Sequence, residues 1–230
     1  MSMSIFGRAG RCVSSLFDRT NRNSNALTTK DNNLIDWLCD WLVNSPPRQI
    51  SPKFKGPPLL LFSDGACEFP ENKDRVVTCG ALLFDPRDGG LLYFGFRINR
   101  TLELEWSKSG RRQLVTEAEL LPQLISRRLW AKRLYKSNVI CFLDSEPAKF
   151  CCIKGSSDTP SCEDIVRAIQ FEEKELLPWS WFSRVPSFSN PSDAASRLDF
   201  ELMSKLFPTA NRVEADNLQP LTLQNGIWAN

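Results

Sequence analysis

The chain has 230 residues, with 29 basic and 27 acidic side chains and a formal net charge of +2 at pH 7. Apolar residues make up 42% and charged residues 24%, a composition typical of a globular protein with a sizeable core. The sequence contains no histidine, which excludes a histidine base and a Ser-His-Asp triad. The near-neutral total neither favours nor excludes a nucleic-acid partner, because acids elsewhere can balance a basic face.

The cysteines and the apolar runs limit where the protein can work. The eight cysteines form no Cys-x-x-Cys pair, and without histidine they do not match the usual ligands of zinc. Several lie in apolar stretches, where a reduced cysteine behaves as a small hydrophobe. These features predict an intracellular, reducing compartment. No run reaches the ~18 apolar residues of a membrane span, so we expect no membrane partner.

Residues 1–56 predict an arm separate from the main domain. Residues 1–30 are rich in arginine and poor in acids, which fits a transit peptide, a basic arm or a piece of a larger polypeptide. The spacing of Leu34, Leu38 and either Trp41 or Leu42 predicts a helix over 32–43. A proline-rich segment over 45–58 then predicts a stiff, extended linker, so we begin the main domain at residue 57.

The first half of the main domain predicts an antiparallel meander. The apolar run 59–62 indicates a buried strand that ends at Ser63-Asp64-Gly65. Strands over 76–84 and 91–98 follow, and the turn residues of 85–90 between them are typical of a hairpin. We expect 99–112 to be a polar connection.

Helices dominate the second half. The pattern predicts a helix over 116–135, a buried strand over 138–143 and a helix over 145–155 that Ser145 caps. A helix over 162–177, a last strand over 179–185 and a final helix over 190–206 capped by Asn190 complete the domain. The main domain thus spans 57–206, and we expect 207–230 to form a loose, polar tail.

Four acids follow the ends of separate elements and are candidates for a common site: Asp64, Glu119, Asp144 and Asp193. Each has a simpler explanation alone, as a turn residue, a capping box or a helix start. Glu117 competes with Glu119, because the two lie about 200° apart on a helix and only one can face the site. An acid in an apolar strand is costly unless it is paired or binds a metal, so the set favours a metal site.

Four segments carry a family resemblance: FSDGA (62–66), TEAELLP (116–122), FLDSEPAK (142–149) and RVPSFSNPSDAASR (184–197). Together they resemble the ribonuclease H domains of retroelement reverse transcriptases, with DIRS-like elements as the nearest type. The resemblance implies an α/β fold whose five-stranded mixed sheet has the order 3-2-1-4-5, with helices on both faces. It also implies hydrolysis of the RNA strand of RNA–DNA hybrids.

The resemblance assigns roles to the four acids. Asp64 would bridge two Mg²⁺ ions, which Mn²⁺ can replace, while Glu119 and Asp144 would hold one ion and Asp193 the other. Substrate contacts would come from Gly65, Ser145, Lys108, Arg111 and Arg112, although a solvated loop explains the three basic residues equally well. Many ribonucleases H have a loop histidine near the fourth acid, and this chain has Pro186 and Ser187 there.

The sequence leaves open whether the domain belongs to a longer polyprotein and whether it is catalytically active. FGRAGR (6–11) and SPPRQISP (45–52) resemble the end of the polymerase part of the same retroelements, which implies a polymerase partner within a longer polyprotein. A catalytically silent module of this fold, which tethers a polymerase or a nucleic acid, is the alternative function. A nuclease or transposase of the same fold that acts on DNA is a third.

Overall fold

The computed structural model describes residues 27–44, 56–69, 74–110 and 112–215. The predicted linker, apart from its last residues, lies outside the described residues, as do Arg111, most of the basic arm and most of the predicted tail. None of the described helices is both long and apolar enough to cross a membrane.

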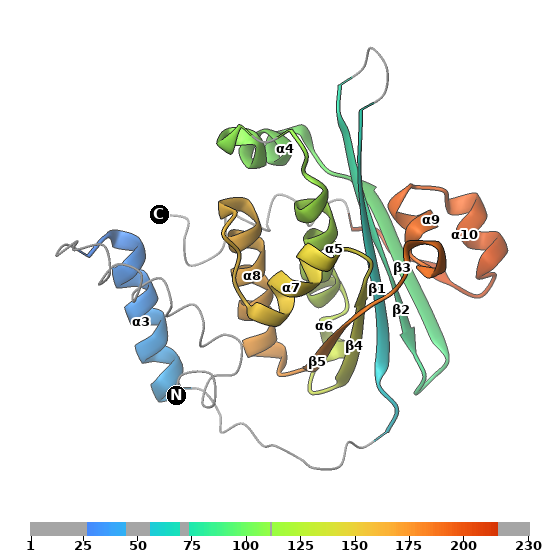
Figure 1. The fold of residues 1–230 in the computed structure, drawn as a ribbon. Coiled ribbons are helices and arrows are strands. Elements are labelled where there is room, and N and C mark those ends of the chain that lie inside the picture. Colours follow the sequence, from blue (N-terminus) through green and yellow to red (C-terminus); the bar gives the residue numbers. More distant parts are fainter. Residues whose placement is uncertain (1–26, 45–55, 70–73, 111, 216–230) are drawn as a thin grey trace.

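A mixed sheet forms the centre of the domain (Figure 1). Its meander consists of β1 (Leu59–Glu68), β2 (Val76–Asp85) and β3 (Gly90–Arg97), and β4 (Asn138–Leu143) and β5 (Trp179–Arg184) follow. The order β5-β4-β1-β2-β3 confirms the predicted order, with β4 parallel to β1 and β5 parallel to β4. β1 is therefore a central strand, which is consistent with its burial.

Two strand predictions need correction. β1 does not end at Asp64 but continues to Glu68, because its pairing with β2 extends to the pair Glu68 and Val76. The described sheet has six strands rather than five, since β6 (Asn211–Arg212) pairs in parallel with β3. A two-residue strand leaves no periodic signal in the sequence, and it lies in the segment predicted to be a loose tail.

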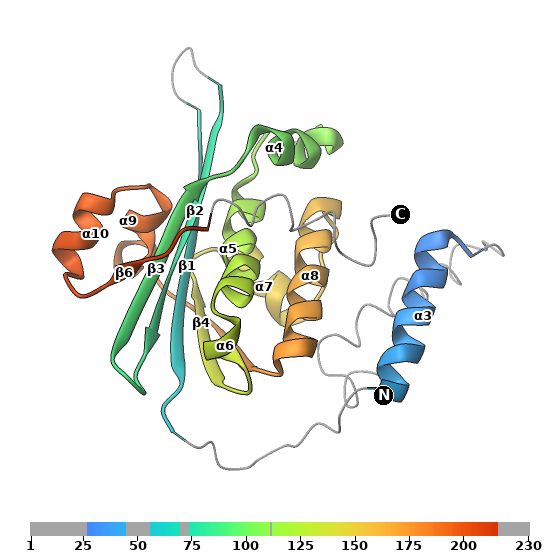
Figure 2. The ribbon, with the colours of Figure 1, turned by 180° about the vertical axis from the view of Figure 1, so that it is seen from behind.

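One face of the sheet carries the long helices. α5 (Val115–Leu129) packs on β1 and β2, and α7 (Glu146–Lys154) and α8 (Pro160–Leu176) pack against α5 (Figure 2). The predicted helix over 116–135 is interrupted at Trp130, whose ψ of 26° ends α5 before α6 (Ala131–Leu134) begins. Pro122 lies inside α5, and the Ser126 hydroxyl donates a hydrogen bond to the Pro122 carbonyl at 2.6 Å.

The opposite face carries α9 (Asp193–Ser196) and α10 (Phe200–Leu206), which Figure 1 shows beside β2 and β3. The sequence predicted one helix over 190–206, but Leu198 adopts a φ of +62° and separates the two. A Cβ added at Gly95 would lie 2.0 Å from the Ala195 carbonyl oxygen, and one at Gly80 would lie 2.6 Å from the Ser196 nitrogen. Both glycines therefore allow α9 to lie directly on the sheet.

The predicted polar connection over 99–112 contains a helix, α4 (Arg100–Trp106), followed by a 3₁₀ turn, η2 (Ser107–Ser109). Asn99 caps α4 by accepting a hydrogen bond from the Leu102 amide. Leu102 and Trp106 are buried in the main core, four residues apart on one side of the helix. The high charge of the segment concealed this short apolar spacing from the sequence analysis.

The arm helix is confirmed as α3 (Thr29–Asn44), with a start at Thr29 rather than residue 32. Asp31 accepts hydrogen bonds from the amide and hydroxyl of Thr28, which fixes the helix start. Lys174 of α8 lies 5.6 Å from the centre of the Trp37 ring and 3.9 Å from Asp40. These contacts place α3 beside α8, as Figure 2 shows.

Candidate active site

Three carboxylates from separate elements converge where β4 ends. Ser63 of β1 and Leu143 of β4 form the last pair between these two parallel strands, and Asp64 and Asp144 each come directly after it. Neighbouring strands lie ~4.8 Å apart, which brings these two residues together. Glu119 of α5 completes the cluster, and one oxygen of each carboxylate lies within 4.8 Å of the others.

Gly65 allows Glu119 to reach this cluster. A Cβ at Gly65 would lie 2.3 Å from the carbonyl carbon of Ala118 and 2.5 Å from the Glu119 nitrogen. No real side chain tolerates such distances to backbone atoms, so only glycine permits α5 to approach β1 this closely. This packing explains why residue 65 is a glycine, and the predicted contact of Gly65 with substrate stays a prediction.

The competing acid, Glu117, has a different environment. It is fully buried and accepts a hydrogen bond from the Ser161 hydroxyl of α8 at 2.7 Å. Glu117 therefore links α5 to α8, whereas Glu119 lies in the carboxylate cluster. The geometry therefore favours Glu119 over Glu117 as the acid of the candidate site, which is the choice made from the sequence.

Burial and mutual repulsion change the acidity of the cluster. Burial, helped by the charges of Asp144 and Asp193, raises the pKa of Asp64 to about 6, although a hydrogen bond from Ser196 opposes the shift. Burial also raises the pKa of Glu119 to about 11, together with its contact with Asp144 and the charge of Asp64. Without a cation, Glu119 therefore retains a proton at neutral pH, whereas Asp64 is mainly protonated only below about pH 6.

Two buried oxygens in the cluster have no hydrogen-bond partner among the described residues: Glu119 Oε2 and Asp144 Oδ1. A buried polar atom left in this way costs about 1–3 kcal/mol. A divalent cation would satisfy both oxygens and would offset the repulsion between the carboxylates. Mg²⁺ and Mn²⁺ prefer oxygen ligands, so the residues present fit such an ion.

Asp193, the fourth predicted ligand, does not join the group of three. It opens α9, its side chain is 43% exposed, and it pairs with Arg197 at 3.0 Å. Its charge nevertheless reaches Asp64, whose pKa it helps to raise. The structure thus brings three of the four acids together, and the metal-binding role of Asp193 stays a prediction.

The hydrogen-bond partners of Asp64 and of the adjacent Ser63 were not predicted from the sequence. The buried hydroxyl of Ser196 bonds to Asp64 Oδ2. Asn190 Nδ2 donates to the Ser63 carbonyl at 3.1 Å, and Gln123 Nε2 donates to the Ser63 hydroxyl at 2.8 Å. The spacing of Asp193 and Ser196, three residues apart on one helix face, was the only signal in the sequence.

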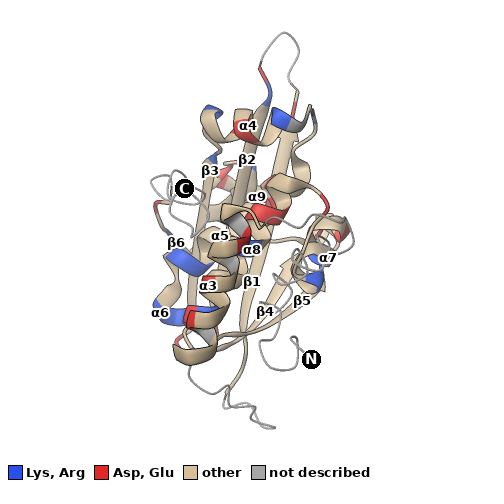
Figure 3. Cartoon of the chain, turned by 90° about the vertical axis from the view of Figure 1, so that its left-hand side faces the viewer, with Lys and Arg blue, Asp and Glu red and all other residues tan. Residues whose placement is uncertain are grey.

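The remaining predicted substrate residues lie outside the cluster. The Ser145 hydroxyl caps α7 by accepting a hydrogen bond from the Ala148 amide at 3.3 Å. Lys108 is exposed in η2, and the exposed Arg112 guanidinium lies 5.9 Å from the centre of the Phe69 ring. In the view of Figure 3, acidic and basic residues alternate over the described elements rather than forming one basic stripe. Substrate contacts at these positions stay predictions.

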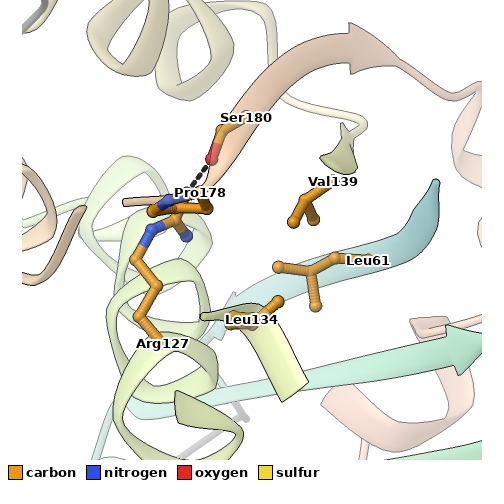
Figure 4. Close-up of a pocket in the computed structure, with 6 residues that line it drawn as sticks. All are labelled: Leu61, Arg127, Leu134, Val139, Pro178 and Ser180. Carbon is orange, nitrogen blue, oxygen red and sulfur yellow. Dashed lines mark hydrogen bonds between the residues drawn. The ribbon is translucent and has the colours of Figure 1, made fainter. Parts of the chain in front are cut away.

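Figure 4 shows a hollow whose lining includes none of the three carboxylates. Six side chains line it: Leu61, Arg127, Leu134, Val139, Pro178 and Ser180. The hollow has no space for a water-sized sphere, so it is a packing gap and not a ligand site. Arg127 fills its polar side, where it pairs with Glu173 at 2.7 Å and donates to Ser180 at 3.4 Å.

Comparison with known proteins yields structural neighbours alone. No protein-family model matches the sequence, and no curated protein matches it. The RNase H1 of the halophilic archaeon Halobacterium salinarum is similar at 17% identity and a TM-score of 0.47, over 63% of this chain and 98% of that one. The N-terminal RNase H domain of rv2228c from Mycobacterium tuberculosis is similar at 11% identity and a TM-score of 0.43. That match covers 64% of this chain and 96% of the other chain.

A foamy viral protease-reverse transcriptase, solved with an RNA/DNA hybrid, is similar at 12% identity and a TM-score of 0.42. The match covers 80% of this chain and 27% of the viral chain. At these identities the likenesses concern the fold, and they leave the chemistry of this chain to be argued from its own residues.

Proposed function

We propose that the protein is an Mg²⁺-dependent endonuclease of the ribonuclease H type, which hydrolyses the RNA strand of RNA–DNA hybrids. The observation that carries the proposal is the convergence of Asp64, Glu119 and Asp144, with two unsatisfied oxygens among them. Two buried carboxylates, Asp64 and Glu119, beside the half-buried Asp144 destabilise a fold unless a cation binds them, so a purely structural role explains the cluster poorly.

The three converging carboxylates would hold the metal, with Asp193 at the exposed rim as the proposed fourth ligand. Two Mg²⁺ ions, when bound, supply an activated water and stabilise the leaving oxygen. The chain's own part is to release the proton that Glu119 retains in the free protein and to keep the carboxylates oriented. Because the chain has no histidine, proton transfer by an imidazole takes no part.

The cellular context is a further part of the proposal. The sequence motifs support an origin in a retroelement polyprotein, in which the polymerase part is the partner and also contacts the hybrid. Mn²⁺ would replace Mg²⁺ in such a site, because both ions accept carboxylate oxygens.

Cleavage of an end-labelled RNA–DNA hybrid, with Mg²⁺ present or chelated, tests the proposal. We expect the RNA strand to be cleaved when Mg²⁺ is present and not when it is chelated, and we expect no cleavage of duplex DNA. Asp64→Asn should lose the activity. Asp158→Asn, in an exposed loop before α8, is the matched control and should retain full activity. Cleavage of DNA instead would indicate a DNA nuclease, and no Mg²⁺-dependent cleavage would favour the catalytically silent module.

A further inference from the structure

Ser196 is a buried hydroxyl in direct contact with the carboxylate cluster. It lies at the end of α9, it is fully buried, and its Oγ bonds to Asp64 Oδ2 on the neighbouring strand β1. The same Oγ lies 2.9 Å from the carbonyl oxygen of Asp193. The hydroxyl therefore has two acceptors but a single hydrogen to donate.

The two acceptors differ in what else satisfies them. The Asp193 carbonyl already accepts the backbone amide of Arg197 at 3.0 Å. An ionised Asp64 can only accept hydrogen bonds, so in its metal-binding state the shared hydrogen must come from Ser196. Hydrogen bonds to a charged acceptor are also about twice as strong as neutral ones, which favours donation to Asp64.

We propose that Ser196 is a positioning residue, which holds the Asp64 carboxylate in the orientation that a divalent cation requires. This inference rests on the proposed function, because it concerns the same site. Its hydroxyl occupies an acceptor position on Oδ2 of the Asp64 carboxylate and so restricts how that carboxylate can rotate. Because Ser196 and Asp193 stand on the same short helix, α9 would place the fourth acid and orient the first acid together.

The glycines of the sheet make this arrangement possible. Gly80 and Gly95 let α9 lie against β2 and β3 so closely that a Cβ at either glycine would overlap its backbone. A hydroxyl is short, and it reaches Asp64 only because the helix backbone is held this near. Ser196 is thereby fixed by backbone contacts rather than by a flexible side chain.

The test compares Mn²⁺ binding by calorimetry in the full chain and in three variants. Ser196→Ala removes the hydroxyl, and Ser196→Cys fills the space again but with a much weaker donor. Ser126→Ala is the matched control, because Ser126 is equally buried and donates to a backbone carbonyl away from the site. We expect both Ser196 variants to bind Mn²⁺ about 10–100-fold more weakly, and Ser126→Ala to bind it normally.

Two further measurements distinguish a positioning role of Ser196 from a role in packing alone. The melting temperature in chelator should change similarly in Ser196→Ala and Ser126→Ala, and the Mg²⁺ concentration for half-maximal hybrid cleavage should rise in the Ser196 variants alone. Unchanged Mn²⁺ affinity in Ser196→Ala would overturn the proposal, as would recovery of the affinity in Ser196→Cys. Failure of both Ser196 variants to fold would likewise replace positioning by a structural role.

The outcomes also separate this inference from the proposed function. If the unsubstituted protein binds Mn²⁺ but cleaves no hybrid, the proposed function fails, and the Mn²⁺ affinities still decide the role of Ser196. If it binds no Mn²⁺, the metal site and the positioning role are overturned together.

Discussion

Asp64 is the residue whose surroundings have the clearest thermodynamic consequence. Its pKa rises from 3.8 to about 6 on folding, chiefly through burial. Between these two values the folded protein retains a proton that the unfolded chain releases. The stabilisation from this proton is complete below pH 3.8 and is lost as the pH rises through about 6. Glu119 adds to this loss of stability at higher pH, since burial raises its pKa as well.

We therefore predict that the metal-free protein loses stability between about pH 4 and pH 6, by roughly 3 kcal/mol from Asp64 alone. Urea unfolding in chelator across this range measures the loss. Asp64→Asn should show a shallower loss, because an amide does not titrate, whereas Asp158→Asn should follow the unsubstituted protein. Identical pH profiles for Asp64→Asn and the unsubstituted protein would contradict the assigned pKa.

Mg²⁺ should reverse this destabilisation. A cation that binds only the folded state stabilises it by roughly 2.7 kcal/mol at a hundred times its dissociation constant. We expect the melting temperature at pH 7 to rise with Mg²⁺ in the unsubstituted protein and in Asp158→Asn. Asp64→Asn should show little or no rise, and an equal rise in all three would place the cation elsewhere.

At the scale of elements, the β2–β3 hairpin is tied to α6 by a buried acid. The Asp85 carboxylate, with a 3% exposed side chain, accepts hydrogen bonds from Arg87 at 2.6 Å and from Arg133 at 2.8 Å. The bond from Arg87 is the main cause that holds the pKa of Asp85 well below its usual range. The stabilisation is present above pH ~4 and is lost as the pH falls further.

Asp85→Asn should accordingly lower the free energy of unfolding at pH 7 by about 1.5–3 kcal/mol, the size of hydrogen bonds to a charged group. The difference from the unsubstituted protein should shrink as the pH falls below about 4, because Asp85 of the unfolded chain then binds a proton that Asp85 of the folded protein does not. Asp88→Asn is a useful comparison, because Asp88 also pairs with Arg133 but its side chain is 52% exposed. We expect a smaller loss there, measured by the same urea titrations.

The contact between β1 and α5 gives a second prediction at this scale. Gly65→Ala would place a Cβ within 2.5 Å of three backbone atoms of Ala118 and Glu119, which cannot move as a side chain can. We expect a loss of at least about 1–3 kcal/mol in the free energy of unfolding and weaker Mn²⁺ binding, because α5 must shift and take Glu119 with it. Unchanged Mn²⁺ affinity in a folded Gly65→Ala variant would contradict this coupling.

The elements also show what the sequence could and could not predict. The meander, the crossover and the order of the first five strands follow from local apolar patterns and turn residues. The length of β1 does not, because its pairing with β2 carries it past Asp64 to Glu68. The break between α9 and α10 depends on the positive φ of Leu198, a conformation that no apolar pattern specifies.

The same distinction holds for the site. Motif spacing found Asp64, Glu119 and Asp144, because each follows or opens a predictable element. It missed Ser196, Asn190 and Gln123, whose hydrogen bonds join residues 132, 127 and 60 positions apart, respectively. Such partners are set by how α5 and α9 lie on the sheet, so they appear only once the tertiary structure is known.

At the scale of the whole molecule, the segment after α10 is part of the packed structure. β6 pairs with the edge strand β3, and the Val213 amide donates to the Tyr93 carbonyl at 2.8 Å. Ala215 is 3% exposed and belongs to the main core, on the face opposite α9. The Arg212 guanidinium lies 3.6 Å from the centre of the Phe200 ring. The segment therefore connects α10, the sheet edge and the main core.

We predict that a chain ending at Leu206 is less stable than one ending at Ala215. The shorter chain exposes the edge of β3 and loses at least one backbone hydrogen bond, worth about 0.5–1.5 kcal/mol, together with the burial of Ala215 and the Arg212 contact. Urea unfolding of both chains in chelator measures the difference. Mn²⁺ affinity should change little, because the three converging carboxylates lie on β1, α5 and after β4, which the truncation leaves intact. Equal stability of the two chains would mean that β6 contributes nothing to the fold, and a large loss of Mn²⁺ affinity would mean that the sheet edge supports the site through α9.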